Sequence, residues 1–148
     1  GRILLVRATD EPVYCKGPRT QISIFMSPLN VHVNRSPCEG TVRDVQHHHG
    51  TYLAAYRDEA SIKNENTEMA LESKWGMVLV RQVAGYIARR TVCRVKAGIQ
   101  LTRGERFGII KFSSRVDLYL PRECQVMVKP GDRVLAGETI VAVMPDRA

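Results

Sequence analysis

One short pattern occurs twice in this chain and restricts its fold more than any other sequence feature. The segment Val95–Gly98 is followed by Gly104–Glu105. Thirty-three positions later, Val128–Gly131 is followed in the same way by Gly137–Glu138. Each copy predicts a strand, a tight turn and then a second turn, with glycine supplying the positive φ that such turns need. Two copies predict a pseudo-symmetric, mainly β structure with repeated hairpins.

Short strands are also predicted outside the repeat, because most apolar runs are rich in β-branched residues and bounded by Gly or Pro. The expected strands are Arg2–Arg7, Gln21–Met26, Gly40–Val45, Met77–Val83, Thr91–Val95, Phe107–Phe112, Val116–Leu120, Cys124–Val128 and Thr139–Val143. A short helix is expected over Tyr52–Ser61, and the polar stretch Ser61–Ser73 is interpreted as a loop. Since Val128–Gly137 is similar to biotinyl and lipoyl carrier domains, the expected architecture is a β-sandwich of the barrel-sandwich-hybrid type.

Length and charge narrow the class of protein. A chain of 148 residues fits one domain, so residues 1–148 are expected to form a single catalytic or binding unit. The net charge of +7 favours an anionic partner. A membrane surface is preferred over nucleic acid, because Arg89–Arg90 is the one basic doublet and no aromatic residues alternate with it.

The cysteines and the chain start add two expectations. Cysteines at positions 15, 38, 93 and 124 form no C-x-x-C pair, so free thiols in a reducing compartment are expected and a zinc site is not. No apolar run reaches the roughly 18 residues of a transmembrane helix. The sequence begins at Gly1 without Met and enters a strand-like run at once, so we expect it to be a piece of a longer protein.

Two clusters contain residue types that catalysis uses. The first, Phe25–Pro37, follows an expected strand and carries His32 in an alternating Val-His-Val stretch. The second, Phe107–Pro121, has Ser113 and Ser114 where two strand-like runs meet. Taken alone, the histidine is more simply interpreted as a partly exposed strand-edge residue bonded to a carbonyl, and two adjacent serines where strands meet are normally a turn.

Together the two clusters resemble phosphatidylserine decarboxylase in its short prokaryotic form, and the resemblance extends from about Gln21 to Val143. The family's F-x-S-P-x-x-x-H motif is matched by Phe25, Ser27, Pro28 and His32. Its processing site is matched by Gly108, Phe112, Ser114, Val116 and Asp117. The segments Asn64–Asn66 and Gln82–Gly85 also fall where family motifs are expected.

The resemblance implies a pyruvoyl-dependent enzyme that converts phosphatidylserine to phosphatidylethanolamine. In that family a serine attacks the preceding carbonyl, the chain splits, and the serine becomes a pyruvoyl group that serves as the electron sink. The resemblance assigns this role to Ser114, with the cut after Ser113 and products of residues 1–113 and 114–148. It assigns the role of base to His32, because an imidazole transfers protons near neutral pH. No metal is expected.

Two departures from the family pattern concern processing. Ser113 stands where the family usually has glycine, which eases the strained backbone of an acyl shift. Normal processing, slowed processing and an unprocessed or impaired chain therefore all stay open. The family's orienting aspartate lies in an A-D-G segment, of which only Gly1 is matched here. Asp10 and Asp117 are the carboxylates that remain, and neither matches the motif.

The resemblance also implies a serine phospholipid as substrate. An apolar pocket is expected, because desolvation favours loss of the carboxylate charge. Its candidate lining residues are Phe25, Met26, Leu29 and Phe112, and the candidates for holding the lipid phosphate are Arg35 and Lys111. We expect a homodimer on the cytoplasmic face of the cell membrane, peripherally attached, with this shortened form soluble and no nucleic acid bound.

Two other functions stay open. A non-catalytic carrier of the biotinyl or lipoyl type would present a modified lysine at a hairpin tip, for which Lys111 is the candidate. A zinc peptidase on a similar scaffold would need an H-x-H pair, which His32–Asn34 does not provide. The run His47–His49 is interpreted as a surface loop before Gly50, because consecutive side chains on a strand point to opposite faces and three in a row rarely converge on one ion.

Overall fold

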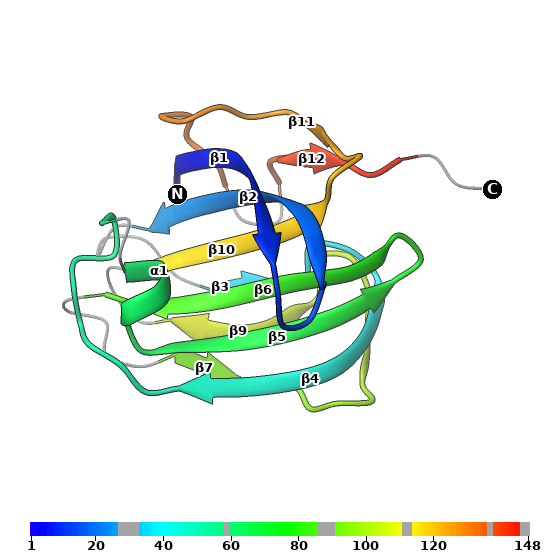
Figure 1. Cartoon of the computed structure of the whole chain (residues 1–148), viewed down its shortest axis with the longest axis horizontal. Coiled ribbons are helices and arrows are strands. Elements are labelled where there is room, and N and C mark those ends of the chain that lie inside the picture. The colour runs from blue at the N-terminus through cyan, green and yellow to red at the C-terminus, as the bar shows by residue number, and fades with distance from the viewer. Residues whose placement is uncertain (27–32, 58–59, 86–90, 111–113, 136–137, 146–148) are drawn as a thin grey trace.

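The structure is a computed structural model that describes residues 1–26, 33–57, 60–85, 91–110, 114–135 and 138–145 (Figure 1). Within these residues the secondary structure is almost all strand, which confirms the expected mainly β class. The strands are β1 (Arg2–Glu11), β2 (Gly17–Met26), β3 (Val33–Arg35), β4 (Gly40–His48), β5 (Asn66–Ser73), β6 (Gly76–Ala84), β7 (Thr91–Cys93), β8 (Gln100–Leu101), β9 (Arg106–Ile110), β10 (Ser114–Pro121), β11 (Gln125–Val126) and β12 (Ala142–Val143). The helix α1 (Ala60–Lys63) is a single turn.

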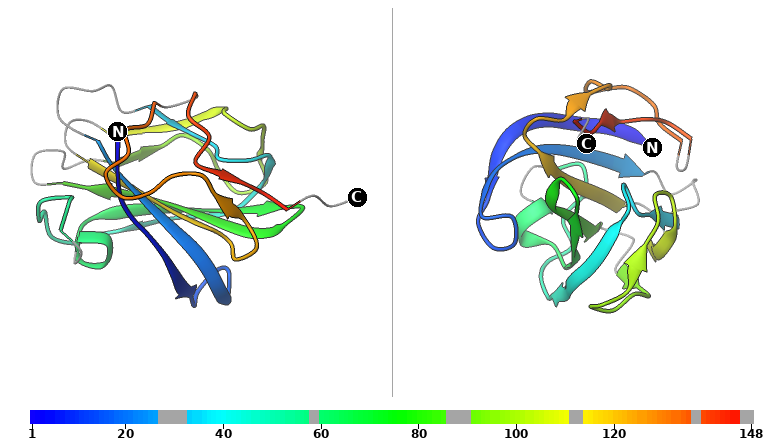
Figure 2. Two further views of the ribbon diagram at one scale, coloured as in Figure 1. Left: turned by 90° about the horizontal axis from the view of Figure 1, so that it is seen from above. Right: turned by 90° about the vertical axis from the view of Figure 1, so that its right-hand side faces the viewer.

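Two antiparallel sheets face one another across the core. The large sheet has the strand order β1-β2-β10-β6-β5-β4-β8, the smaller sheet has the order β3-β9-β7, and β11 pairs with β12. Figures 1 and 2 show the smaller sheet lying against one face of the large one. The apolar core fills the space between them, where Val116, Val80 and Phe107 belong to one buried cluster. This arrangement confirms a sandwich-like β fold.

The sequence repeat is visible as two turns of the same form. Gly98 and Gly131 have φ angles of 95° and 93°, in the region that glycine adopts without strain. In the first copy Gly104 also has a positive φ, at 81°. Gly137, its counterpart in the second copy, lies outside the described residues.

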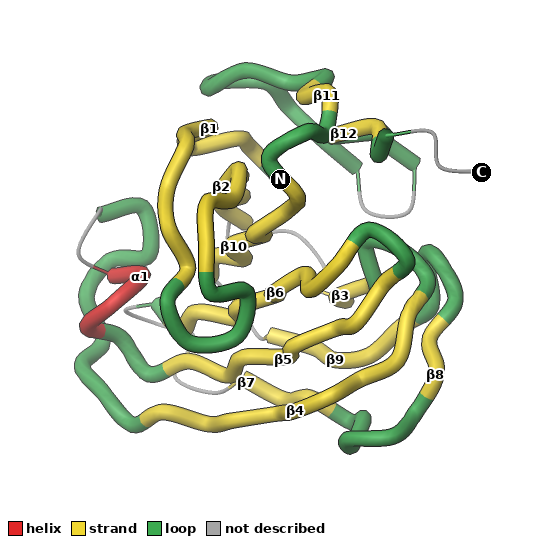
Figure 3. Tube along the Cα trace, turned by 45° about the vertical axis from the view of Figure 1, so that its right-hand side comes forward, coloured by secondary structure: helices red, strands yellow, loops and turns green. Residues whose placement is uncertain are grey.

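Each turn hydrogen-bonds to the same position of an edge region in the large sheet. The Gly98 amide donates to the Val42 carbonyl of β4 at 2.7 Å, and the Gly131 amide donates to the Ile3 carbonyl of β1 at 2.8 Å. Both Ile3 and Val42 stand immediately before a register shift in their strands. Figure 3 shows β8 beside β4 at one end of the sheet and the β11–β12 hairpin beside β1 at the other. The expected pseudo-symmetry is therefore real, and it relates β1 to β4.

The expected strands all overlap observed ones, but two expectations between residues 52 and 73 are wrong. Among the described residues of this region only Ala60–Lys63 is helical, whereas a helix over Tyr52–Ser61 was expected. The physical reason is Asn64, whose side chain accepts from the Leu53 amide at 2.9 Å and donates to the Leu53 carbonyl at 2.8 Å. A helix over these residues would use the Leu53 carbonyl to accept from the Arg57 amide, but Asn64 occupies that carbonyl and Arg57 donates to the Ala54 carbonyl at 3.0 Å.

The polar stretch interpreted as a loop over Ser61–Ser73 contains β5, an interior strand of the large sheet. Its polar residues are buried because they have partners, as buried polar groups generally do. Glu68, for example, is 8% exposed and pairs with the Arg81 guanidinium of β6 at 2.9 Å. The polar residues of this stretch therefore belong to a buried strand whose side chains have partners, and not to a solvent-exposed loop.

The alternation of β10 sets up the site. Val116, Leu118 and Leu120 point into the core between the sheets, and Ser114 has the same parity. Arg115 and Asp117 point to the opposite face, yet both are fully buried. Elsewhere, the four cysteines are free thiols as expected, and no helix in the described part of the chain is long and apolar enough to cross a membrane.

Candidate active site around Ser114

Ser114 is the first residue of β10, a strand in the interior of the large sheet. Its Cα is paired with Met26 of β2 on one side and with Ala84 of β6 on the other. The residue has no exposed surface, and its Oγ has no hydrogen-bond partner among the described residues. A buried hydroxyl without a partner costs free energy, so such groups are rare and call for a functional explanation.

The chain on either side of the two sequence motifs is paired at the same corner of the sandwich. Met26, which ends β2, is opposite Ser114, and Val33, which begins β3, is opposite Ile109 of β9. The segments 27–32 and 111–113 follow directly from these paired residues and lie outside the described residues. They contain Ser27, Pro28, Leu29, His32, Lys111, Phe112 and Ser113. The fold thus brings the described ends of the serine motif and of the histidine motif together.

The two other segments of the resemblance also meet next to Ser114. Ala84, the partner of Ser114, donates its amide to the Glu65 carbonyl at 2.9 Å. The Ala84 carbonyl accepts from Asn64 Nδ2 at 2.6 Å. Ser114, Ala84 and Glu65 therefore lie side by side on the neighbouring strands β10 and β6 and immediately before β5, so both segments of the resemblance come close to Ser114.

A buried amide pair ties the two sheets together on the same face as Ser114. Gln82 of β6 is opposite Val116, so its side chain points between the sheets. There Gln82 Nε2 donates to Asn34 Oδ1 of β3 at 2.7 Å, and both residues are buried. This bond fixes the position of β3 at Asn34, which is two residues after His32 in the sequence. Both amides lie in segments that the sequence analysis selected, but it gave neither a role and did not predict this bond.

The other face of β10 carries a buried polar network. Asp117 Oδ1 accepts from Ser23 Oγ at 2.5 Å and from Arg115 Nε at 2.7 Å. Arg115 Nη2 also donates to Ser23 Oγ at 3.1 Å, and Nη1 donates to the Arg57 carbonyl at 3.1 Å. Asp117 differs from Ser114 by three positions and therefore lies on the opposite face of the strand. On that face it binds Arg115 and Ser23.

This network was missed by the sequence reasoning, although a signal for it exists. Polar residues alternate with apolar ones within two strand segments: Gln21 and Ser23 in the second half of β2, and Arg115 and Asp117 in the first half of β10. Alternation with period two places them on one face, and pairing of interior strands places them side by side. The other carboxylate considered, Asp10, is exposed and paired with Pro18 near the end of β1.

The described candidates for substrate binding fall in three different places. Met26 is on the Ser114 side of β2 and packs at the margin of the core. Phe25 has the opposite parity, and its ring meets Tyr56 edge to face at 6.1 Å between centroids. Arg35 Nη1 donates to the Gly104 carbonyl at 2.9 Å. Leu29, Lys111 and Phe112 lie outside the described residues.

The histidine run differs from its interpretation as a surface loop. His47 and His48 belong to β4 and are paired with Thr67 and Asn66 of β5. The rule that consecutive side chains diverge holds for His48, which binds Glu68 at 2.6 Å. His47 and His49, two positions apart, instead converge, because residues i and i+2 share a face.

Comparison with known proteins gives the family. Residues 8–142 match the profile of the family described as phosphatidylserine decarboxylase. The chain is 46% identical over 141 residues to a phosphatidylserine decarboxylase proenzyme of Chlorobaculum tepidum, an alignment covering 95% of this chain and 65% of that protein. It is 47% identical over 146 residues to the proenzyme of Nitratidesulfovibrio vulgaris, covering 96% of this chain and 65% of the relative.

A third relative, the proenzyme of Geobacter metallireducens, is 50% identical over 127 residues, covering 85% of this chain and 58% of that protein. The chain thus spans roughly two thirds of the length of the curated relatives it matches. No solved structure matches the chain. The profile match covers most of the sequence and agrees with the two motifs that flank the Ser114 corner, so the chain belongs to the phosphatidylserine decarboxylase family.

Proposed function

We propose that the protein containing this chain decarboxylates phosphatidylserine to phosphatidylethanolamine, using a pyruvoyl group that it makes from Ser114. The observation that carries this proposal is the Ser114 hydroxyl, which is fully buried and has no hydrogen-bond partner among the described residues. Ser114 is also the first residue of β10, where it pairs with Met26 of β2. Met26 belongs to the histidine motif and is its last described residue before His32. The names of the relatives, which call them proenzymes, support processing of the chain.

The proposed processing uses only groups of the chain and one water molecule. Ser114 Oγ loses its proton to His32 and bonds to the carbonyl carbon of Ser113, while the peptide C–N bond breaks and the nitrogen is protonated. Loss of the Ser114 Cα proton then breaks the Cβ–Oγ bond, which releases residues 1–113 with a free carboxylate. The dehydroalanine left at position 114 takes up water and loses ammonia, so residues 114–148 begin with a ketone.

The residues at this corner fit a group formed at position 114. A pyruvoyl group, once present, would supply the electron sink that stabilises charge at the substrate Cα. The chain would hold it at the start of β10, which is fixed on both sides by β2 and β6. His32 would accept a proton in processing and serve again in decarboxylation or in reprotonation of the product. The Gln82–Asn34 bond would keep β3, and with it the backbone leading to His32, in place.

The position of β10 also predicts that the two products stay together. After cleavage at Ser113–Ser114, the new amino-terminal strand of the small chain would still pair with β2 and β6 along its length. Such a strand, buried on both faces, would separate only if the large sheet opened. The mature enzyme would therefore behave as one particle with two chains.

Membrane binding and assembly are part of the same proposal. A net charge of +7 would draw the protein to an anionic bilayer that contains the substrate. We propose peripheral attachment at the cytoplasmic face of the cell membrane and a homodimer. Met26, Leu29 and Phe112 remain the candidates for an apolar substrate pocket near Ser114, with Lys111 for the phosphate.

The activity is tested with the full-length protein and vesicles that contain phosphatidylserine and phosphatidylcholine. Release of carbon dioxide and formation of phosphatidylethanolamine are expected for the wild type and should be lost in Ser114→Ala. Phenylhydrazine, which reacts with ketones, should inactivate the wild type. Arg43→Met, at an exposed ion pair on β4, is the control and should keep full activity. Turnover by Ser114→Ala at the wild-type rate would overturn the proposal.

A further inference from the structure

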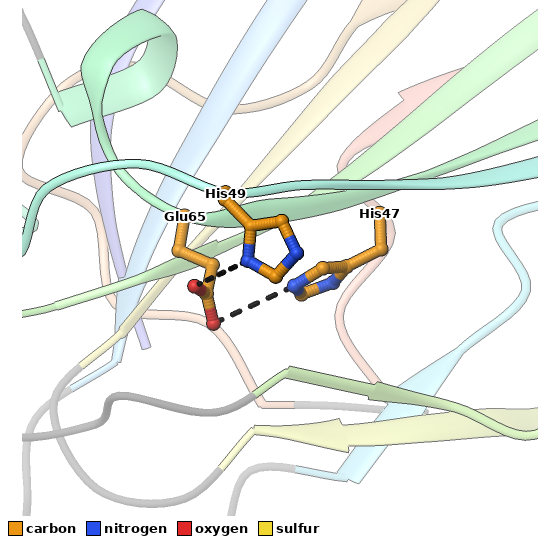
Figure 4. Close-up of side chains that lie close together, drawn as sticks. All are labelled: His47, His49 and Glu65. Carbon is orange, nitrogen blue, oxygen red and sulfur yellow. Dashed lines mark ion pairs between the residues drawn. The ribbon is translucent and has the colours of Figure 1, made fainter.

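A cluster of metal-ligating side chains lies where β4 ends and β5 begins. His47 is in the last part of β4, His49 follows that strand, and Glu65 immediately precedes β5. Figure 4 shows both imidazoles turned toward the Glu65 carboxylate. His47 Nε2 is 3.5 Å from Glu65 Oε2, and His49 Nδ1 is 3.4 Å from Glu65 Oε1. One nitrogen from each ring and one carboxylate oxygen all lie within 4.8 Å of one another.

Each imidazole lies at a separation that suits a tetrahedral ion from a different Glu65 oxygen, and a small movement of the exposed His49 side chain would place both nitrogens around an ion held by one of these oxygens. With Zn²⁺ bonds of roughly 2.0–2.1 Å to nitrogen and oxygen, tetrahedral ligand atoms lie roughly 3.4 Å apart. Two imidazoles and one carboxylate are a donor set that zinc prefers, with a fourth position left for water. We propose that His47, His49 and Glu65 form a zinc-binding site of this protein.

The surrounding contacts hold two of the three ligands in orientation. His47 Nδ1 is 2.8 Å from Thr67 Oγ1, a contact that occupies Nδ1 and leaves Nε2 as the ring nitrogen that faces Glu65. Tyr52 Oη donates to Glu65 Oε1 at 3.2 Å. The Glu65 amide donates to the Thr51 carbonyl at 3.1 Å. Partners of this kind fix ring and carboxylate positions in metal sites and strengthen binding.

Exposure shows how an ion would enter. The Glu65 side chain is 14% exposed, whereas the His49 side chain is 91% exposed. The Glu65 carboxylate thus lies on the protein side of the site, and the His49 ring lies on the solvent side, from which an ion would arrive. The bound ion would join the end of β4 to the start of β5 and close the connecting segment 50–64 into a loop.

The end of that loop lies next to Ala84, the strand partner of Ser114, because Asn64 Nδ2 donates to the Ala84 carbonyl and the adjoining Glu65 carbonyl accepts the Ala84 amide. Two interstrand spacings of roughly 4.8 Å separate the backbones of Glu65 and Ser114, or about 10 Å. We assign the ion no part in the chemistry at Ser114. Its effect would be to stabilise the loop, as any ligand that binds only the folded state does.

The chain provides a matched control within the same run of histidines. His48 lies between the two proposed ligands in sequence but points to the other face of the sheet, where its Nε2 is 2.6 Å from Glu68 Oε1. A run of histidines that bound metal as a flexible tag would use all three rings alike. A folded site uses His47 and His49 and spares His48.

The test is calorimetric titration of ZnCl₂ into the EDTA-treated, full-length protein and its variants. The wild type and His48→Ala should each bind one ion with the same affinity, within about threefold. His47→Ala, His49→Ala and Glu65→Gln should each weaken binding at least tenfold, an effect that even outer partners of metal ligands commonly produce. Zinc should also raise the melting temperature of the wild type and of His48→Ala, and that of Glu65→Gln much less.

Three results would overturn the assignment. These are a wild type that takes up no zinc, a His48→Ala variant as weakened as His47→Ala, and a Glu65→Gln variant with wild-type affinity. Glu65→Gln keeps the shape of the side chain, so it also serves if either histidine variant fails to fold. Circular dichroism of each variant before titration verifies folding.

Discussion

The two faces of β10 handle buried polar groups in opposite ways. On one face, Asp117 accepts hydrogen bonds from Ser23 and Arg115, and the Arg115 guanidinium makes further bonds to Ser23 and to the Arg57 carbonyl. On the other face, Ser114 is equally buried, but its hydroxyl has no partner among the described residues. Both groups sit on the same interior strand, within four residues of each other.

This difference separates a structural role from a chemical one. A buried charge is tolerated only when it is paired and hydrogen-bonded, and the Arg115–Asp117 pair meets that condition. An unpartnered hydroxyl stabilises nothing, so its retention at Ser114 is better explained by what its oxygen does. Substitutions on the two faces should therefore have opposite consequences for stability and for processing.

Removing the ion pair between Arg115 and Asp117 on the hydrogen-bonded face of β10 should have the largest effect on stability. Arg115→Met leaves the Asp117 carboxylate buried without its cation, which should lower the free energy of unfolding by about 3–5 kcal/mol. Urea denaturation of the full-length protein measures this loss. Arg43→Met removes an arginine from an exposed pair with Glu72 and should cost less than about 1 kcal/mol. Equal losses in the two variants would mean that the Arg115 pair is not the structural anchor described here.

The amide pair between the sheets should have the next largest effect. Gln82→Leu removes the donor that Asn34 Oδ1 accepts from and should cost about 1–3 kcal/mol, because a buried acceptor is left unsatisfied. Asn34→Leu should cost a similar amount. The double variant should cost less than the sum of the two single ones, as a double-mutant cycle by urea denaturation would measure. Strict additivity would show that the two amides do not act as a pair.

Alanine substitutions in the two repeated turns should have the third largest effect, a loss of about 1–2 kcal/mol in the free energy of unfolding. Gly98→Ala and Gly131→Ala each place a side chain at a positive φ, which strains the backbone of an L-residue by roughly that amount. A Cβ at either position meets no atom within 4 Å, so strain is the only cost and the two losses should be alike. Gly17→Ala, where the space is also open and φ is not positive, should be close to neutral. Thermal unfolding compares all three.

The smallest change in stability is expected for Ser114→Ala. The hydroxyl makes no hydrogen bond to a described residue, so its removal should alter the free energy of unfolding by less than about 1 kcal/mol, in either direction. The same variant should lose processing completely. A loss of several kcal/mol in urea denaturation would show that Ser114 is a structural residue after all.

The sequence predicted the strands and the repeat because both depend on local rules. Strand periodicity and positive-φ glycines at Gly98 and Gly131 are set within a few residues. Strand β5 and the Arg115–Asp117 network were not predicted, because their polar residues are buried by partners on distant strands. From sequence alone Glu68 is expected to be exposed to solvent, because its partner Arg81 is on β6 and becomes its neighbour only when the strands pair.

The site was predicted only in part, and for a related reason. The resemblance selected Ser114 and His32 from motifs, and pairing of Met26 with Ser114 and of Val33 with Ile109 brings the described ends of those motifs together. Asn34 and Gln82 lie inside segments that the sequence analysis selected, but the bond that joins them across the core could not be predicted, since it depends on how the two sheets pack. Likewise, the convergence of His47 and His49 on Glu65 depends on how β4 pairs with β5.

The central claim is that Ser114 cuts its own backbone, and intact-mass spectrometry of the denatured full-length protein tests it most directly. Wild type and Ser113→Gly should each yield two fragments that separate between residues 113 and 114, the second carrying a ketone in place of its amino group, with Ser113→Gly cut at least as completely. Ser114→Ala should give one uncut chain. A single uncut chain for both the wild type and Ser113→Gly, or a mass increase on Lys111 in place of cleavage, would contradict the claim.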